Sequence, residues 1–384
     1  MGDAEILGSV QKMFKYGRVF GHNPWQINES YEMKLELLPS LYSAFVVCLL
    51  AFNFAYLSIW LFIVKSEEGT LNSLETMYYY YKIMEGFTSL LSFTYYIRGY
   101  HRMVVRLRLF FKCTQLIKKY QIPLEVDSDE QHYILLIFVG ILYVTILIAD
   151  FFICIYWNNV DLTVTSWLLG IFTILFNRFS LVQFIVIFDF NGKLFSAFNR
   201  EIRNINTRKH NINDEGETIF FTAKERVRTV FYLYDTFVYM VEQGIIDSNI
   251  LILSQILSSI IGLTGFLYSN FVLIINYVFK NEEFQWLIFV QSLYWSVFIF
   301  ATIAIMIFTS SHSVEVCNDM AMAIHEVLCE EDSFLIADEL ENFSLQLLHK
   351  KIDVSVFGLF QIDSHLLGSM IVATITFLVI LIQS

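Results

Sequence analysis

Proline is almost absent from this chain, with three residues, Pro24, Pro39 and Pro123, among 384. Charged residues are also scarce, at 16% of the composition, against about 25% in soluble globular domains. Long helices can therefore run without proline breaks, and a soluble globular fold is disfavoured. The apolar runs are continuous rather than alternating, which argues against a membrane β-barrel. What remains is an all-α membrane protein.

Several kinds of binding site are also missing from the sequence. The five cysteines are widely spaced and form no CxxC pair, so they indicate no disulfide framework. The eight histidines avoid the centres of the apolar runs and show no metal-ligand spacing. The acidic residues behind the net charge of −12 are scattered through the loops, and no basic tract with interleaved aromatics occurs. We expect no metal, no other cofactor and no nucleic-acid partner.

Hydrophobic residues make up 56% of the chain and gather in membrane-length runs, since a helix of about 20 apolar residues crosses a bilayer. The sequence predicts seven spans: Leu38–Val64, Leu71–Ile97, His132–Trp157, Val164–Phe190, Asn249–Phe279, Phe284–Ser310 and about Ser364–Gln383. The last span is followed by Ser384 alone.

The distribution of Lys and Arg predicts how these spans are oriented, because cytoplasmic connections carry an excess of both. With the N-terminus inside, Lys65 and Lys280 are the two basic residues on the outer side, and Lys82 and Arg178 lie within spans. All the others fall in the N-terminal segment, in the three long connections, 98–131, 191–248 and 311–350, or directly after the last of these at Lys351. The pattern therefore predicts a cytoplasmic N-terminus and an extracellular C-terminus.

The long cytoplasmic connections are expected to be partly helical. Two apolar series repeat at three- and four-residue spacing, Val227, Phe231, Tyr234, Val238 and Val241 in one, and Val316, Met320, Ile324, Val327, Phe343 and Leu347 in the other. Ordinary helix packing within the chain explains such seams, and packing between subunits explains them equally. The sequence alone leaves both interpretations open.

The last span carries polar side chains on one face. Ser369, Thr376 and Gln383 are seven residues apart, so they drift by only about 20° per repeat along one stripe of a helix. Polar groups in lipid are costly unless they face a partner or water. The stripe either lines a pore or hydrogen-bonds to neighbouring helices.

A short motif connects this helix to a known family. The block Phe357-Gly358-Leu359-Phe360-Gln361-Ile362-Asp363 and the helix after it resemble the C-terminal signature of insect gustatory receptors, which reads Thr-Tyr, five apolar residues, then Gln-Phe. Thr376 and Gln383 match that signature, Leu378 to Ile382 supply the five apolar residues, Phe377 replaces the tyrosine and Ser384 the final phenylalanine.

The resemblance implies a seven-helix receptor-channel over residues 1–384. We expect a cytoplasmic N-terminal segment (1–37), a six-span ligand-binding bundle (38–310), a cytoplasmic anchor segment where subunits meet (311–350) and a pore helix (351–384). A homo- or heterotetramer would open to cations when a small-molecule tastant binds, in the cell membrane of gustatory neuron dendrites. The resemblance places the gate at Gln383.

In four copies, rings of Ser369, Thr376 and Gln383 would face the axis, with Val379 and Ile380 among the apolar residues between them. Asp363 or Ser364 is suitably placed to cap the pore helix, and Gly358 is expected to allow a break where a cytoplasmic half-helix meets the span.

The resemblance also implies a ligand pocket in the outer half of the second to sixth spans. Amphipathic residues there are the candidates: Tyr81, Glu85, Asp150, Arg178, Tyr268, Gln291, Tyr294 and Trp295. Buried ionisable groups in a membrane are often functional, yet Glu85 could pair with Lys82, and Asp150 with Arg178. The aromatic residues could equally form an interfacial belt. An aromatic site slightly favours bitter-type molecules.

Three other functions fit the sequence less well. A membrane enzyme needs a catalytic constellation, and a transporter needs internal repeats with broken spans; the sequence displays neither. An insect odorant receptor would share the architecture, and the Thr376 to Gln383 motif argues against that branch. We therefore expect a receptor-channel in contact with membrane lipids rather than an enzyme.

Overall fold

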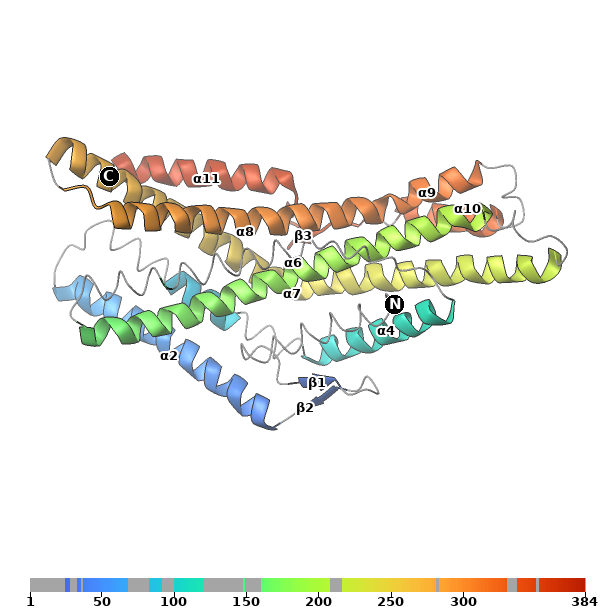
Figure 1. Cartoon of the computed structure of the whole chain (residues 1–384), viewed down its shortest axis with the longest axis horizontal. Helices are drawn as coiled ribbons and strands as arrows, with labels where there is room; N and C mark the ends of the chain where they lie inside the picture. The colour runs from blue at the N-terminus through green and yellow to red at the C-terminus, as the bar shows by residue number, and fades with distance from the viewer. Residues whose placement is uncertain are drawn as a thin grey trace.

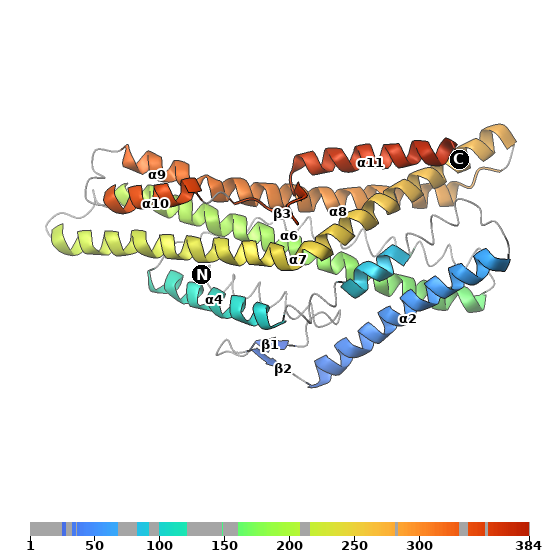
Figure 2. The same ribbon diagram turned by 180° about the vertical axis from the view of Figure 1, so that it is seen from behind.

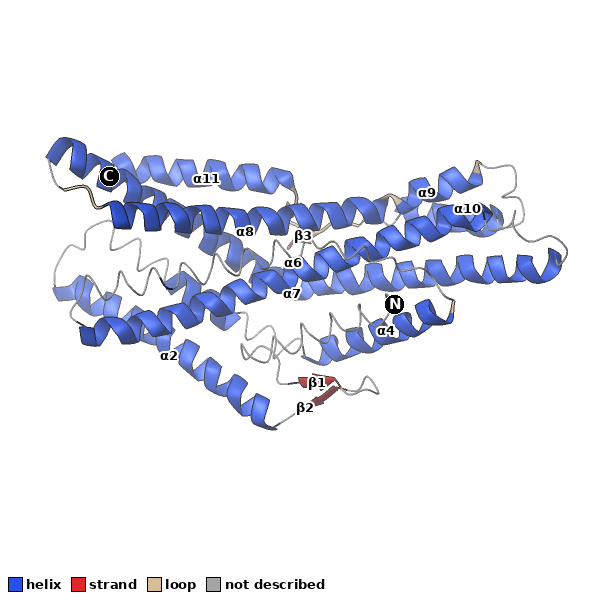
Figure 3. Cartoon of the chain, viewed as in Figure 1, coloured by secondary structure: helices blue, strands red, loops and turns tan. Residues whose placement is uncertain are grey.

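The computed structural model of the chain describes residues 25–27, 33–35, 37–67, 83–91, 100–120, 148, 160–207, 216–280, 283–329, 337–349 and 352–383. Helices dominate these residues, and the strands are short (Figure 3). The helices are α2 (Leu37–Glu67), α4 (Tyr100–Lys119), α6 (Val160–Thr207), α7 (Gly216–Lys280), α8 (Trp286–Asn318), α9 (Met320–Leu328), α10 (Ala337–His349) and α11 (Ser364–Gln383). Residues 83–91 form a further helical stretch.

Among the residues that the structure describes, four helical stretches are long and apolar enough to cross a membrane: Ser180–Asn204, Lys224–Lys280, Trp286–Leu328 and Ser364–Gln383. The predicted spans from Leu38, Val164, Asn249, Phe284 and Ser364 all fall on helices. Residues 83–91 cover part of the second predicted span, and the third lies outside the described residues apart from position 148.

The helices α6, α7 and α8 pack against one another along most of the long axis of the molecule (Figure 1). The helix α11 lies on one side of this layer, and α2 and α4 lie on the other side, as Figure 2 shows from behind. The arrangement places α11 at the edge of the bundle rather than within it.

The helices α6 and α7 extend well beyond the predicted spans into the charged connections. There the seam residues Val227, Tyr234 and Val238 are buried, together with Met320 and Ile324 of the second series. They belong to one core cluster that α4, α6, α9 and α10 complete. Within the described residues, both apolar seams therefore pack inside a single chain, which is the ordinary-packing interpretation.

The described part of the chain also contains two antiparallel strand pairs. The strands β1 (Trp25–Ile27) and β2 (Met33–Leu35) pair close to the start of α2, and β3 (Ser355–Val356) pairs with β4 (Phe360–Gln361) just before α11. The second hairpin corrects one expectation. A cytoplasmic half-helix was expected to meet the span, but α10 ends at His349, and a hairpin connects it to α11.

Candidate functional site

The helix α11 is held by one narrow face. Leu366, Met370 and Thr374, which follow one another at four-residue spacing, are its buried residues. Leu366 and Met370 join a core cluster with residues of α7 and α8, among them Ile252, Ile256, Ile303 and Met306. In an 18-residue apolar stretch of this helix 17% of the residues are buried, against 56% in the corresponding stretch of each of the other three membrane-length helices. Most of α11 is therefore left uncovered by the chain itself.

The predicted polar stripe lies on this uncovered part. Ser369, Thr376 and Gln383 are all exposed, and Val379 and Ile380 are also exposed. The Ser369 hydroxyl donates to the His365 carbonyl at 3.0 Å, and the Thr376 hydroxyl donates to the Val372 carbonyl at 2.8 Å. Because these donors are used within the helix, the hydroxyl lone pairs remain as outward acceptors.

The start of α11 is fixed by Asp363. Its carboxylate accepts hydrogen bonds from the backbone N–H groups of His365 and Leu366, at 3.0 and 3.1 Å. These are the contacts of an N-cap residue, which satisfies N–H groups that have no partner in the helix.

The hairpin before α11 turns at Phe357 and Gly358. The N–H of Leu359 donates to the Val356 carbonyl at 2.9 Å, and both central residues have positive φ, 52° for Phe357 and 68° for Gly358. Positive φ at both central residues is the pattern of a type I′ turn, and Leu359 completes a three-residue connection between the paired residues Val356 and Phe360. Gly358 adopts this conformation at no steric cost, so it is a turn residue in a strand pair rather than a break within a helix.

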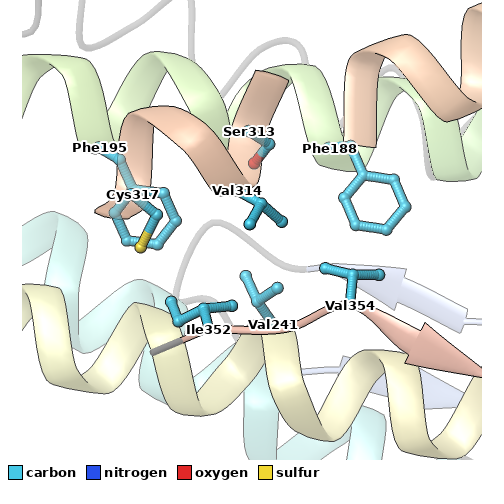
Figure 4. Close-up of a pocket in the computed structure, with 8 residues that line it drawn as sticks. All are labelled: Phe188, Phe195, Val241, Ser313, Val314, Cys317, Ile352 and Val354. Atoms are coloured by element: carbon cyan, nitrogen blue, oxygen red, sulfur yellow. The ribbon is translucent and has the colours of Figure 1, made fainter. Parts of the chain in front are cut away.

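A small pocket lies where the segment leading to α11 crosses the bundle. Phe188 and Phe195 of α6, Val241 of α7, and Ser313, Val314 and Cys317 of α8 face Ile352 and Val354, as Figure 4 shows. Its interior has room for about one water molecule. The apolar contacts hold the chain that connects α10 to α11 against all three long helices.

One pair of polar residues lies between α7 and α8. The Ser292 hydroxyl donates to the side-chain oxygen of Asn270, and both residues are more than nine-tenths buried. The Asn270 side-chain N–H₂ group has no hydrogen-bond partner among the described residues. Beside this pair, Trp295 stacks on Phe266 with ring centroids 6.1 Å apart. The arrangement offers a donor next to an aromatic surface.

A second polar group ties three elements together around Asn177 of α6. The Asn177 side-chain nitrogen donates to the Glu85 carbonyl at 2.8 Å, and Ser89 donates to the Asn177 side-chain oxygen at 3.0 Å. Gln255 of α7 donates to the Asn177 carbonyl at 3.4 Å. Glu85, Asn177 and Gln255 are all buried, so this group joins residues 83–91 to α6 and α7.

The candidate ligand residues fall into separate groups. Glu85 belongs to the Asn177 group, while Tyr268 and Trp295 are buried beside Asn270 and Ser292. Gln291 and Tyr294 are half-buried on α8. Gln255 and Tyr268 mark the two groups on α7, and 13 residues of helix separate them, which corresponds to about 20 Å. Within the described residues, no single pocket gathers all the candidates.

Three predicted residues cannot be added to these groups. Tyr81 and Asp150 lie outside the described residues, and Arg178 lies on α6 directly after Asn177. The sequence patterns did not single out Asn177 or Ser292. In the sequence each of them is an amide or hydroxyl residue within an apolar run. Such residues are too common in membrane helices to identify a functional site by themselves.

Comparison with known proteins decides the family. A family model described as "7tm Chemosensory receptor" matches residues 11–384.

The chain belongs to the seven-transmembrane chemosensory receptor family.

Solved structures agree with this assignment at the level of the fold. The olfactory receptor OR5 from Machilis hrabei superimposes with a TM-score of 0.72 at 12% identity, covering 100% of both chains. The same receptor in complex with eugenol gives a TM-score of 0.75, with the same identity and coverage. No curated protein sequence matches the receptor. The predictions of the insect chemosensory family and of an all-α membrane fold are therefore confirmed.

Proposed function

We propose that this receptor is a ligand-gated cation channel of the gustatory type, opened by a small-molecule tastant. The observation that carries the proposal is the uncovered face of α11, on which Ser369, Thr376 and Gln383 are exposed. A lipid-length helix with an outward polar stripe needs a polar environment for that stripe. Copies of α11 around an axis, four in the proposed tetramer, would provide it.

The chemistry of the stripe suits cations. The hydroxyl protons of Ser369 and Thr376 are donated to backbone carbonyls of the same helix, so oxygen lone pairs would face the axis. Apolar side chains between them, such as Val379 and Ile380, would close the pore by dewetting. In this arrangement Gln383 forms the ring nearest the outer mouth and acts as the gate.

Ligand binding is proposed for the outer half of the bundle. The buried aromatic residues Tyr268 and Trp295, together with Asn270 and Ser292, lie on the two helices that continue into the cytoplasmic cluster. The similarity to a receptor whose structure holds eugenol supports a small-molecule ligand. A ligand that changes the packing of α7 and α8 would act directly on α11, which contacts both helices.

An odorant receptor channel is the alternative, because the similar solved structure is an olfactory receptor. We favour the gustatory type because Thr376 and Gln383 match the gustatory signature. The cytoplasmic extensions of α6, α7 and α8, with α9 and α10, would form the anchor between subunits. The receptor would lie in the dendritic membrane of gustatory neurons with its N-terminus inside.

Heterologous expression tests the proposal. Cells that express the chain, alone and with other gustatory receptor subunits, are exposed to panels of tastants and odorants under voltage clamp. We expect a tastant-evoked cation current that Gln383→Ala alters in conductance or closure. Surface-expressed receptor that responds only to odorants would contradict the gustatory assignment, and a normal current in Gln383→Ala would remove Gln383 from the gate.

A further inference from the structure

The helix α4 is strongly basic in an acidic protein. Its 20 residues carry Arg102, Arg106, Arg108, Lys112, Lys118 and Lys119 and no Asp or Glu, although the whole chain has a net charge of −12. Arg108, Lys112 and Lys119 are exposed, and so are Val105 and Gln115. At 100° per residue these five positions share one face of the helix. We call Arg108, Lys112 and Lys119 the basic stripe.

The basic stripe lacks the acidic partners that basic residues have elsewhere in the cytoplasmic half. On α6, Lys193 pairs with Asp189 at 3.2 Å and Arg203 with Glu326 at 2.6 Å. On α7, Lys224 and Arg228 both pair with Glu339. Among the described residues, no carboxylate lies within ion-pair distance of the basic stripe; Lys112 instead lies 5.7 Å from the centre of the Tyr232 ring.

Ion pairs to α7 hold the beginning of α4. Arg102 and Arg106 both bind Asp247, which is 5% exposed, and the Arg106 contact measures 2.8 Å. Asp247 precedes the predicted span Asn249–Phe279 by two residues, and Tyr100 follows the predicted span that ends at Ile97 by three. Two independent elements therefore place the beginning of α4 at the cytoplasmic edge of the membrane.

From that edge the helix rises by about 1.5 Å per residue, so Arg108 lies about 12 Å and Lys112 about 18 Å beyond Tyr100. Lys119 lies farther away still. The surface potential of a bilayer falls off within about 10 Å. At their distance from the membrane edge, Arg108 and Lys112 therefore do not reach the phosphates of simple phospholipids. They can reach a headgroup that projects from the bilayer.

The side of the bundle on which α4 lies indicates whether lipid can reach this helix. In both views α4 lies across the long helices from α11 (Figures 1 and 2). If α11 faces the axis of an assembly, as proposed above, α4 is at the periphery, where the surrounding lipid is. Arg102 is also 69% exposed despite its ion pair, so its guanidinium remains accessible from that side.

We infer that Arg108 and Lys112, with Arg102 at their membrane edge, bind the polyphosphorylated headgroup of a phosphoinositide in the cytoplasmic leaflet. The headgroup carries several phosphates on a projecting ring, which matches basic residues spread over about 15 Å of helix. Clusters of Lys and Arg immediately cytoplasmic of a membrane span recognise such lipids. Because Asp247 and the lipid phosphates both bind Arg102, the lipid would also act on the contact between α4 and α7.

The test is lipid binding by the purified full-length receptor, so it does not depend on channel activity. Native mass spectrometry in detergent, with short-chain phosphatidylinositol bisphosphate, phosphatidylserine and phosphatidylcholine, gives the apparent Kd of each lipid. We expect Arg108→Gln/Lys112→Gln to weaken bisphosphate binding about thirtyfold. The conservative variant Arg108→Lys/Lys112→Arg keeps both charges and should bind within twofold of the parent chain.

The matched control is Lys193→Gln/Arg203→Gln, which removes the same number of charges from residues that already have acidic partners. It should leave bisphosphate binding within twofold of the parent. Equal binding by the parent and by Arg108→Gln/Lys112→Gln would overturn the inference, and so would an equal loss in the control. Phosphatidylserine binding as tight as bisphosphate binding would contradict recognition of a phosphorylated inositol ring.

Discussion

The backbone N–H of Leu366 donates a hydrogen bond to the Asp363 carboxylate at 3.1 Å, and this contact fixes the residue at which α11 begins. The same carboxylate oxygen accepts from the N–H of His365. The cap lies between a tight hairpin and a helix that is buried on only one face, so it contributes more to the position of α11 than it would in a buried helix.

Replacing Asp363 by Ala should fray the first turn of α11. Loss of an N-cap costs about 1 kcal/mol, and hydrogen exchange at the amides of residues 364–367 should rise about fivefold, while exchange in the middle of α7 stays unchanged. Asp363→Asn keeps an acceptor oxygen and should exchange like the parent chain. Equal exchange in Asp363→Ala and the parent would show that the cap does not hold this end.

Alanine should have different effects at the turn residue Gly358 and at the helical residue Gly368. Gly358 has a φ of 68°, whereas Gly368 is a helical residue with nothing within 4 Å of its missing Cβ. Gly358→Ala should destabilise the receptor by about 1 kcal/mol, and Gly368→Ala should not destabilise it. Apparent melting temperatures in detergent compare the two. A higher melting temperature for Gly358→Ala than for Gly368→Ala would contradict the turn assignment.

The ion pairs of α4 and α6 should differ in strength. Asp247 is 5% exposed and binds two arginines, so Asp247→Asn leaves a partly buried guanidinium without its charge partner and should cost about 3 kcal/mol. Glu326→Gln removes an exposed partner of Arg203 and should cost less than about 1 kcal/mol. Thermal melting of both variants measures the difference, and equal shifts would contradict it.

The cysteines test both burial and orientation. Burial raises the pKa of the Cys317 thiol to about 12 and that of Cys113 to about 11, while Cys329 is exposed. Since the thiolate is the reactive form, maleimide at pH 7–9 should modify Cys329 and leave Cys113 and Cys317 intact. In intact cells only a membrane-permeant maleimide should reach Cys329, and Cys329→Ser is the control. Labelling of Cys329 by an impermeant reagent would contradict a cytoplasmic position.

Burial of these thiols also affects stability at high pH. Their pKa values are higher in the folded chain than in the unfolded one, so the folded state binds protons more tightly. The stabilisation is complete below the unfolded thiol pKa of about 8.5, and it declines as the pH rises toward 11 and 12.

Hydropathy predicted the positions of the membrane helices better than their lengths. The predicted span Asn249–Phe279 is part of α7, which begins at Gly216, because backbone hydrogen bonds continue where the apolar run ends. The spacing of Val227, Tyr234 and Val238 did predict a buried seam, since a helical repeat survives in charged segments. Asp363 was predicted from its position beside an apolar run, which is a local signal.

Long-range contacts could not be predicted in this way. Arg102 and Asp247 are 145 positions apart, and nothing in the sequence distinguishes this pair from other combinations of opposite charge. The hairpin at Phe357 could not be predicted from the sequence, because phenylalanine rarely adopts a positive φ. The separation of Glu85 from Tyr268 depends on which residues of α6 and α7 meet, and a periodic pattern does not determine that register.

Cysteine accessibility along α11 tests the pore proposal most directly. Single cysteines are introduced at the exposed positions by Ser369→Cys, Thr376→Cys and Gln383→Cys, and at buried positions by Leu366→Cys and Met370→Cys. A charged thiol reagent is then applied from outside during a ligand-evoked current. If α11 lines the pore, the current changes for Thr376→Cys and Gln383→Cys and stays constant for both buried positions. Modification of the buried positions alone, or an unchanged current at every position, would contradict a pore lined by α11.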